Sequence, residues 1–333
     1  MNFFIVFFME RQKYLFEVLK TRIPVQQRLV DVVEELLCIS TDAAYKRIRG
    51  QKDLSFTELC ALSQKFRLPL EEVFNYKSQQ TAIVNYVPVN FADQEEYKGY
   101  LNRIVGVMSA LKAAPNKEIC LTAQDIPIFH FSKYPELTLF KLYVWNDVII
   151  HKTISFREFC SEMDEYGVMP LFEKIHKTYL EIPSKEIWTH QTIDTILRLI
   201  EHYYEMGAFE DKEIVFSLLK QLESLMDTIK NFADNGYKSK IETPFMLYIS
   251  PVDLENNFLL LKKENESLCM IKLYTINSIS TTNEALCAET EKWIEDLISK
   301  STLISKISVK ERHRFFQTSK NKIDELTARI KTV

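Results

Sequence analysis

The sequence predicts a mainly α protein organised in four parts. Chain-breaking residues are scarce, with 6 glycines and 10 prolines among 333 residues, which disfavours a loop-rich β architecture. Apolar residues recur at helical spacing through most of the first 235 positions, whereas short β-rich runs follow Gly236. We therefore expect an N-terminal module of five helices, a helical middle region, and a small α+β C-terminal part with a short antiparallel sheet.

The predicted boundaries follow changes in composition. Residues 1–76 form the five-helix module. Residues 77–90 contain serine, glutamine, asparagine and proline without a helical period, so we interpret them as a linker. Residues 91–235 form the helical middle region, and residues 236–333 form the α+β part. A chain of 333 residues has the length of two or three domains.

Each helix of the N-terminal module has a recognisable start or end. Pro24 ends the first helix, and Pro69 begins the fifth. Ser40 and Ser55 can cap the third and fourth helices, and Gly50 closes the third. The expected helices are Met9–Ile23, Val25–Leu37, Thr41–Arg49, Phe56–Phe66 and Leu70–Phe74.

The third of these helices has two chemically different faces. Ala44 and Ile48 lie four residues apart, where a core would hold them. The opposite face is polar and basic, as a helix that enters the DNA major groove requires. Lysine and arginine there would contact phosphates or guanines, and an aspartate would accept from a cytosine or cap its own helix. The candidate DNA-binding residues are Thr41, Asp42, Tyr45, Lys46, Arg49 and, beyond the turn, Lys52.

Residues 39–74 carry a distinctive succession of motifs. These are Ile39-Ser40, Ala44-Tyr45-Lys46-Arg47-Ile48-Arg49-Gly50, Leu54-Ser55, Glu58-Leu59 and Leu68-Pro69-Leu70-Glu71-Glu72-Val73-Phe74. This order resembles the lambda-repressor-like, Cro/C1-type helix-turn-helix family, and the resemblance covers residues 9–76. It implies that residues 27–37 are the positioning helix and residues 41–49 the recognition helix. The family's turn between them usually holds a glycine. Here Leu37-Cys38-Ile39 stands in its place, so another residue must make the tight turn.

The charge balance limits how such a module can bind DNA. The net charge is −4, so any nucleic-acid surface must be local. One small module buries little DNA surface, and specific binding therefore takes two copies on two half-sites. We expect a transcriptional regulator that binds double-stranded DNA as a homodimer held by its C-terminal part. The alternative is a protein-interaction scaffold, in which a degenerate helix-turn-helix serves only for docking.

The rest of the chain is predicted from periodicity alone. The expected helices are Phe91–Ala114, Glu136–Ile149, Ser155–Met163, Met169–Leu180, Ser184–Met206, Glu210–Ala233, Asn283–Ser299 and Val309–Ile330. The expected strands are Phe245–Ile249, Asn257–Leu261, Leu268–Ile276 and Leu303–Ile307, with Ile83–Val89 and Glu118–Phe131 extended or irregular.

No pattern of catalytic or metal-ligating residues emerges. The six histidines are far apart, and neither a phosphate-binding glycine loop nor a nucleophile motif occurs. We expect no enzymatic activity, no metal and no cofactor. An enzyme in the C-terminal half would need convergent polar residues in one pocket. The dense aromatics of residues 129–145 and 203–209 indicate either a pocket for a small-molecule effector or, more commonly, a packed helical core.

The composition also bears on location. The six cysteines lack a C-x-x-C pair, which is typical of free, buried thiols in a reducing cytosol. The apolar segment Asn2–Phe8 is too short to span a bilayer and has no basic region before it, so we interpret it as a terminal extension or as upstream of a start at Met9. We expect a cytoplasmic protein without a membrane partner.

Overall fold

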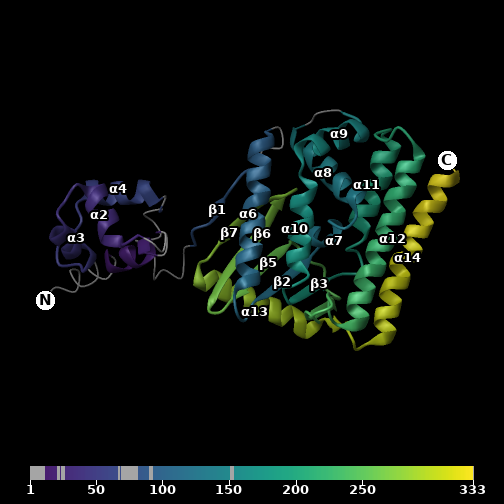
Figure 1. The fold of residues 1–333 in the computed structure, drawn as a ribbon. Helices are drawn as coiled ribbons and strands as arrows, with labels where there is room; N and C mark the ends of the chain where they lie inside the picture. The colour runs from purple at the N-terminus through teal and green to yellow at the C-terminus, as the bar shows by residue number, and fades with distance from the viewer. Residues whose placement is uncertain are drawn as a thin grey trace. The chain divides into compact units, whose positions relative to one another are not determined.

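The chain forms two compact units in the computed structural model, residues 1–83 (unit 1) and residues 84–333 (unit 2) (Figure 1). The structure describes residues 12–20, 23, 27–66, 68, 82–89, 93–150 and 154–332. The predicted helix Leu70–Phe74, the apolar segment Asn2–Phe8 and the start of the predicted first helix lie outside the described residues.

Unit 1 is a helical module with its own core. Residues 12–20 are helical, followed by α2 (Leu29–Leu37), α3 (Thr41–Ile48) and α4 (Phe56–Phe66). Apolar side chains recur every three or four residues along each helix, so each helix buries one side. The buried core consists of Leu15, Phe16, Leu19, Val30, Val33, Ala44, Leu62 and Leu68.

The turn between α2 and α3 is made without glycine. Cys38 adopts the left-handed conformation, with φ 52° and ψ 46°, and its N–H donates to the carbonyl of Glu34. A side chain in this conformation costs about 1 kcal/mol, which the surrounding module has to offset. Cys38 is therefore the residue that makes the tight turn, and Ser40 then caps α3 by accepting from the N–H of Ala43.

Unit 2 is built on a mixed eight-stranded sheet in the order β1-β7-β6-β5-β2-β3-β4-β8. The strands are β1 (Asn85–Tyr86), β2 (Glu118–Ala123), β3 (Ser184–Trp188), β4 (Phe245–Ile249), β5 (Phe258–Lys263), β6 (Glu266–Tyr274), β7 (Asn277–Thr281) and β8 (Thr302–Leu303). The central strands β2, β3 and β4 are parallel and are joined by helical crossovers. The strands β5, β6, β7 and β1 continue the sheet antiparallel on one side, and β8 does so on the other.

Helices cover both faces of this sheet (Figure 1). The larger layer comprises α6 (Gln94–Ala113), α7 (Ile128–Phe131), α8 (Pro135–Ile150), α9 (Phe156–Tyr166), α10 (Met169–Tyr179), α11 (Asp194–Glu205), α12 (Lys212–Asn235) and α14 (Val309–Thr332). The helix α13 (Glu284–Lys300) packs on the opposite face, against β5 and β6. Side chains alternate between the two layers, so Ile119 and Leu121 of β2 meet the larger layer and Cys120 meets the α13 layer.

This architecture corrects the predicted fold class. The expectation of a helical middle region and a short antiparallel sheet confined to residues 236–333 was wrong, because β2 and β3 lie at the centre of one large mixed sheet. The segment Ser184–Trp188 is a strand, and the helix that we expected from Ser184 begins only at Asp194. This segment is a strand because it pairs with a strand on each side. Its charged residues Lys185 and Glu186 are unusual in a central strand, so the sequence did not indicate one.

Other features fall near their predicted places. The helices α8, α9, α10, α12, α13 and α14 overlap their expected ranges closely. The six cysteines are free, but Cys38 is exposed and Cys60 and Cys160 are only half-buried, so the expectation of buried thiols was wrong for these three. In the described part of the chain, no helix has both the length and the apolar character needed to cross a membrane.

Candidate functional site

The structure brings the six candidate DNA-binding residues of unit 1 together on the outside of α3 and its following turn. Five of them lie on α3 or at its end. Lys52 is held close to the end of the helix because its backbone N–H donates to the carbonyl of Lys46 at 3.2 Å. All six are exposed to solvent, whereas Ala44 is fully buried on the opposite side of the helix. The exposed surface formed by Thr41, Asp42, Tyr45, Lys46, Arg49 and Lys52 is called the α3 face below.

The charges of the α3 face are partly paired with one another. Lys46 Nζ lies 2.7 Å from Asp42 Oδ2, and the guanidinium of Arg49 lies 5.2 Å from the ring centroid of Tyr45. An exposed lysine–aspartate pair contributes at most about 1 kcal/mol, so a phosphate can displace the aspartate. Within the described residues Arg49 and Lys52 form no ion pair, and both cations are available to an outside partner.

Thr41 of the α3 face and its neighbour Arg47 have structural roles. Thr41 Oγ1 donates to Glu34 Oε2 at 2.8 Å, which ties the start of α3 to α2. Arg47 is basic in sequence, but its side chain is only 7% exposed and its guanidinium donates to Glu58 Oε1 at 2.6 Å. Burial raises the pKa of Glu58, but the hydrogen bonds from Arg47 and from the Ser55 N–H outweigh it and leave the pKa below its usual value. Arg47 therefore anchors α3 from inside.

A glutamine far away in the sequence holds the turn that follows α3. Gln12 Nε2 donates to the carbonyls of Arg47 at 2.7 Å and Lys52 at 2.8 Å. Its Oε1 accepts from the N–H of Leu54 at 3.0 Å. The turn that carries Lys52 is thereby fixed against α3, and the α3 face has a rigid frame. Sequence reasoning missed Gln12, because nothing in a single polar residue 35 to 42 positions upstream indicates this contact.

The charge of the chain is unevenly divided between the two units. Residues 1–83 contain 12 lysines and arginines against 10 aspartates and glutamates, whereas residues 84–333 contain 30 against 36. The net negative charge of the protein therefore belongs to unit 2, and unit 1 is slightly basic. Net charge therefore favours a polyanion at unit 1 over unit 2.

Unit 2 contains a buried carboxylate at the centre of its sheet. Glu186 of β3 is fully buried and accepts from His130 Nε2 and Trp188 Nε1, each at 3.0 Å, and from the hydroxyl of Tyr179. Burial raises the pKa of Glu186, but the charge and hydrogen bond of His130 outweigh it and leave the pKa below 4.5. Since its partners are themselves buried, this cluster satisfies the carboxylate inside the protein.

A buried lysine lies beside that network. Lys238 Nζ donates to the carbonyl of Ile182 at 2.7 Å and to Ser184 Oγ at 3.0 Å. It also lies 3.5 Å from the ring centroid of Tyr179. Burial lowers the pKa of Lys238 to about 7, although the negative charge of Glu186 raises it. Lys238 thus links the segment after α12 to the loop before β3 and to the first residue of that strand.

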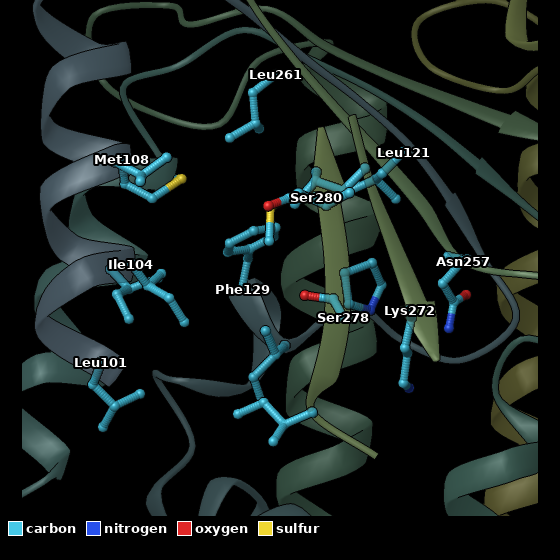
Figure 2. Close-up of a pocket in the computed structure, with 18 of the residues that line it drawn as sticks. Leu101, Ile104, Met108, Leu121, Phe129, Asn257, Leu261, Lys272, Ser278 and Ser280 are labelled. Carbon is cyan, nitrogen blue, oxygen red and sulfur yellow. The ribbon is translucent and has the colours of Figure 1, made fainter. Parts of the chain in front are cut away.

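A cavity of about 350 Å³ lies elsewhere in unit 2, between α6 and the antiparallel half of the sheet. Figure 2 shows Leu101, Ile104 and Met108 of α6 along one side. Strand residues of β2, β6 and β7 form the other side, and Phe129 lies between the two (Figure 2). The size and the apolar walls are those of a small-molecule site, and this cavity is called the α6 cavity below.

Three ionised side chains line one part of the α6 cavity. Asp125 Oδ2 lies 2.6 Å from Lys141 Nζ and 3.4 Å from Lys272 Nζ. Burial raises the pKa of Asp125, but the two ammonium groups hold it below 3.8. Burial lowers the pKa of Lys272, Asp125 raises it and Lys141 lowers it, to a net value below 10.5. One anion and two lysines of the cavity lining are therefore in contact, and Arg103 is a further cation of the described lining.

Comparison with known proteins gives no relative. No family model matches the sequence, and neither a curated protein nor a solved structure matches it. In the described chain, no group of three or more His, Cys, Asp or Glu side chains is placed to hold a metal ion. The function proposed below therefore rests on the residues of the α3 face and the α6 cavity.

Sequence reasoning found the α3 face but not the ionised part of the α6 cavity. Asp125 follows β2, Lys141 lies on α8 and Lys272 on β6, so no local pattern unites them. The position of Asp125 just beyond the carboxyl end of a parallel strand is a signal that could have indicated a site. Among the aromatics, Phe129 and Trp145 line the cavity, whereas others of the same run, such as Phe140, pack in the core.

Proposed function

We propose that this protein is a sequence-specific, DNA-binding transcriptional regulator that inserts α3 of unit 1 into the major groove. The observation that carries the proposal is the division of α3 into a buried side, anchored by Arg47, and an exposed side that holds Lys46 and Arg49. A helix of this kind, presented by a rigid module, is what direct readout of base edges needs. The resemblance of residues 39–74 to the Cro/C1-type family supports the same function.

The residues of the α3 face have different roles in this proposal. Arg49 is long, exposed and unpaired within the described residues, so it is the best candidate for a guanine or phosphate contact. Lys46 exchanges Asp42 for a phosphate, and Lys52 contacts the backbone beyond the end of the helix. Tyr45 contacts a phosphate or a base edge while its ring supports Arg49.

Binding by this module requires two copies. The α3 face carries few positive charges, and a single small module supplies too little surface for a specific complex. We propose a homodimer in the cytoplasm, with the dimer contacts in the C-terminal part of the chain and the two α3 helices about one DNA turn apart, roughly 34 Å.

The test is selection of duplexes from a random pool by the full-length protein. We expect enrichment of an inverted repeat, and we expect Arg49→Ala to weaken binding to that duplex about tenfold. The matched control is Lys65→Ala, which removes an exposed cation of α4 outside the α3 face. Failure to enrich any sequence, or an equal loss in Lys65→Ala and Arg49→Ala, would contradict the proposal.

One observation favours the alternative, a protein-interaction scaffold. Phe56, the first residue of α4, is 76% exposed, and an exposed phenylalanine is typical of a protein contact. In that case Phe56→Ser would abolish co-purification of a partner protein while no duplex is retained at low salt. Duplex retention that survives Phe56→Ser would exclude the alternative.

A further inference from the structure

We propose that the α6 cavity of unit 2 binds a small amphipathic anion, an apolar chain that carries a single carboxylate. This site belongs to unit 2 alone, so the proposal stands or fails independently of DNA binding by unit 1. Its basis is the combination of an apolar cavity, an incompletely neutralised pair of lysines and a buried hydroxyl without a partner.

The α6 cavity exists because small side chains face it from β7. Ser278 and Ser280 of β7 lie in register with Lys272 and Met270 of β6, and all four side chains line the cavity. On β5 the lining residues Phe258, Leu259 and Leu261 are large, but on β7 they are serines, which are too small to reach α6. The short side chains leave a space that the sheet would otherwise fill. The cavity therefore results from the small side chains on β7.

The walls of the α6 cavity are mainly apolar. Leu101, Ile104 and Met108 follow one another at helical spacing along α6 and face the cavity (Figure 2). Leu121 of β2 and Leu261 of β5 line the sheet side. Such walls favour a hydrocarbon chain and disfavour a nucleotide or a sugar, which would leave polar groups without partners.

The lysines of the α6 cavity carry more positive charge than their shared aspartate neutralises. Lys141 and Lys272 both contact the same oxygen of Asp125, so two ammonium groups share one carboxylate. The side chain of Lys141 is only 3% exposed and is held over the rings of Phe131 and Trp145, whereas that of Lys272 is 30% exposed. One positive charge remains without a full counter-charge among the described residues, and Lys272 is the cation that can turn to a ligand. A ligand with one negative charge would balance the two lysines together with Asp125, and a cation would be repelled.

Among the described residues, the α6 cavity also offers a free hydroxyl group and an opening to the surface. Ser132 lines the cavity, is buried, and its Oγ has no hydrogen-bond partner among the described residues. A buried hydroxyl of this kind is normally satisfied, and a ligand oxygen would satisfy it. Val87, Val107 and Arg103 line the cavity and are exposed, so a small molecule can enter from the surface beside α6.

The test uses the full-length protein, isothermal titration calorimetry, and decanoate and decanol as probes with the same chain and different charge. We expect decanoate to bind about tenfold more tightly than decanol, and we expect Lys272→Met to abolish that difference. The matched control is Lys263→Met, which removes an exposed lysine at the end of β5 that does not line the cavity. That variant should bind decanoate as the wild type does.

A second variant keeps the test valid if Lys272→Met is unstable. Met108→Trp fills the space beside α6 without changing any charge, and it should weaken decanoate and decanol alike. Equal affinity of the wild type for decanoate and decanol, or unchanged decanoate binding in either Lys272→Met or Met108→Trp, would overturn the proposal. The absence of any measurable decanoate binding by the wild type would overturn it too.

Discussion

In unit 1 the ionised side chains of the candidate site lie on the outside of one helix, whereas in unit 2 they lie inside and come from separate strands and helices. Lys46 and Arg49 are one helical turn apart on α3 and face solvent. Asp125, Lys141 and Lys272 come from three different elements and meet in a cavity. The first arrangement is available to a large external partner, and the second to a ligand that enters the protein.

Charge can be changed at an exposed site with less effect on the fold than at a buried one. An exposed cation has lost little hydration and can be removed at little cost, so a variant of the α3 face should test binding alone. A buried ion depends on its partners, and removal of one partner leaves an uncompensated charge. A substitution that leaves such an ion without its partner should therefore act mainly on stability.

The largest effect is expected at the centre of the sheet of unit 2. Glu186→Ala leaves His130, Tyr179 and Trp188 without their shared acceptor, and it should lower the free energy of unfolding by about 4 kcal/mol. The measurement is urea unfolding at neutral pH. The control is Glu181→Ala, which removes a half-exposed partner of Lys112 and should cost less than about 1 kcal/mol. Similar losses in the two variants would contradict a stabilising role for Glu186.

A smaller loss is expected inside unit 1. Glu58→Ala leaves the buried guanidinium of Arg47 unpaired and should cost about 2 kcal/mol, because Glu58 itself is 17% exposed. Burial raises the pKa of Glu58, but its hydrogen bonds hold it below its value in the unfolded chain. Its contribution to stability is therefore present above the unfolded pKa and is lost as the pH falls through the folded pKa. Unfolding of the wild type followed from pH 6 to pH 3 should show this loss, and Glu58→Ala should lack it. A variant as acid-sensitive as the wild type would refute this role.

The stability of unit 2 should also rise with pH, but above neutrality. The pKa of Lys238 is about 7 in the folded protein against 10.5 ordinarily, so between these values the unfolded chain binds more protons. Stability should therefore rise with pH in this interval, by up to about 1.4 kcal/mol per pH unit. Denaturant unfolding at pH 7, 8 and 9 measures the slope, and Lys238→Met should remove most of it. A wild-type slope that is flat or negative would show that the ammonium of Lys238 is not destabilised by burial.

The smallest effect on stability is expected on the α3 face. Asp42→Asn breaks only the exposed pair with Lys46, so the free energy of unfolding should change by no more than about 0.5 kcal/mol. The same variant frees Lys46 and should raise affinity for duplex DNA several-fold at low salt. Weaker DNA binding by Asp42→Asn would instead indicate that Asp42 accepts a hydrogen bond from a base.

The sequence predicted what is local and missed what is long-range. The helix Phe56–Phe66, the cap at Ser40 and the two-faced α3 were readable because each depends on neighbours within a few positions. The strand at Ser184–Trp188 was mistaken for helix, since its pairing partners lie more than 60 residues away. The cavity and the role of Gln12 could not be predicted for the same reason, because their contacts join residues from distant parts of the chain.

The most direct test of DNA binding by the α3 face is the salt dependence of the affinity of the full-length protein for its selected duplex. The wild type should bind more weakly as salt rises. The double variant Lys46→Ala, Arg49→Ala should show a slope of log affinity against log salt that is flatter by about 2 units, one for each lost phosphate contact. An equal slope for the two proteins, or no salt-dependent binding by the wild type, would contradict the role proposed for the α3 face.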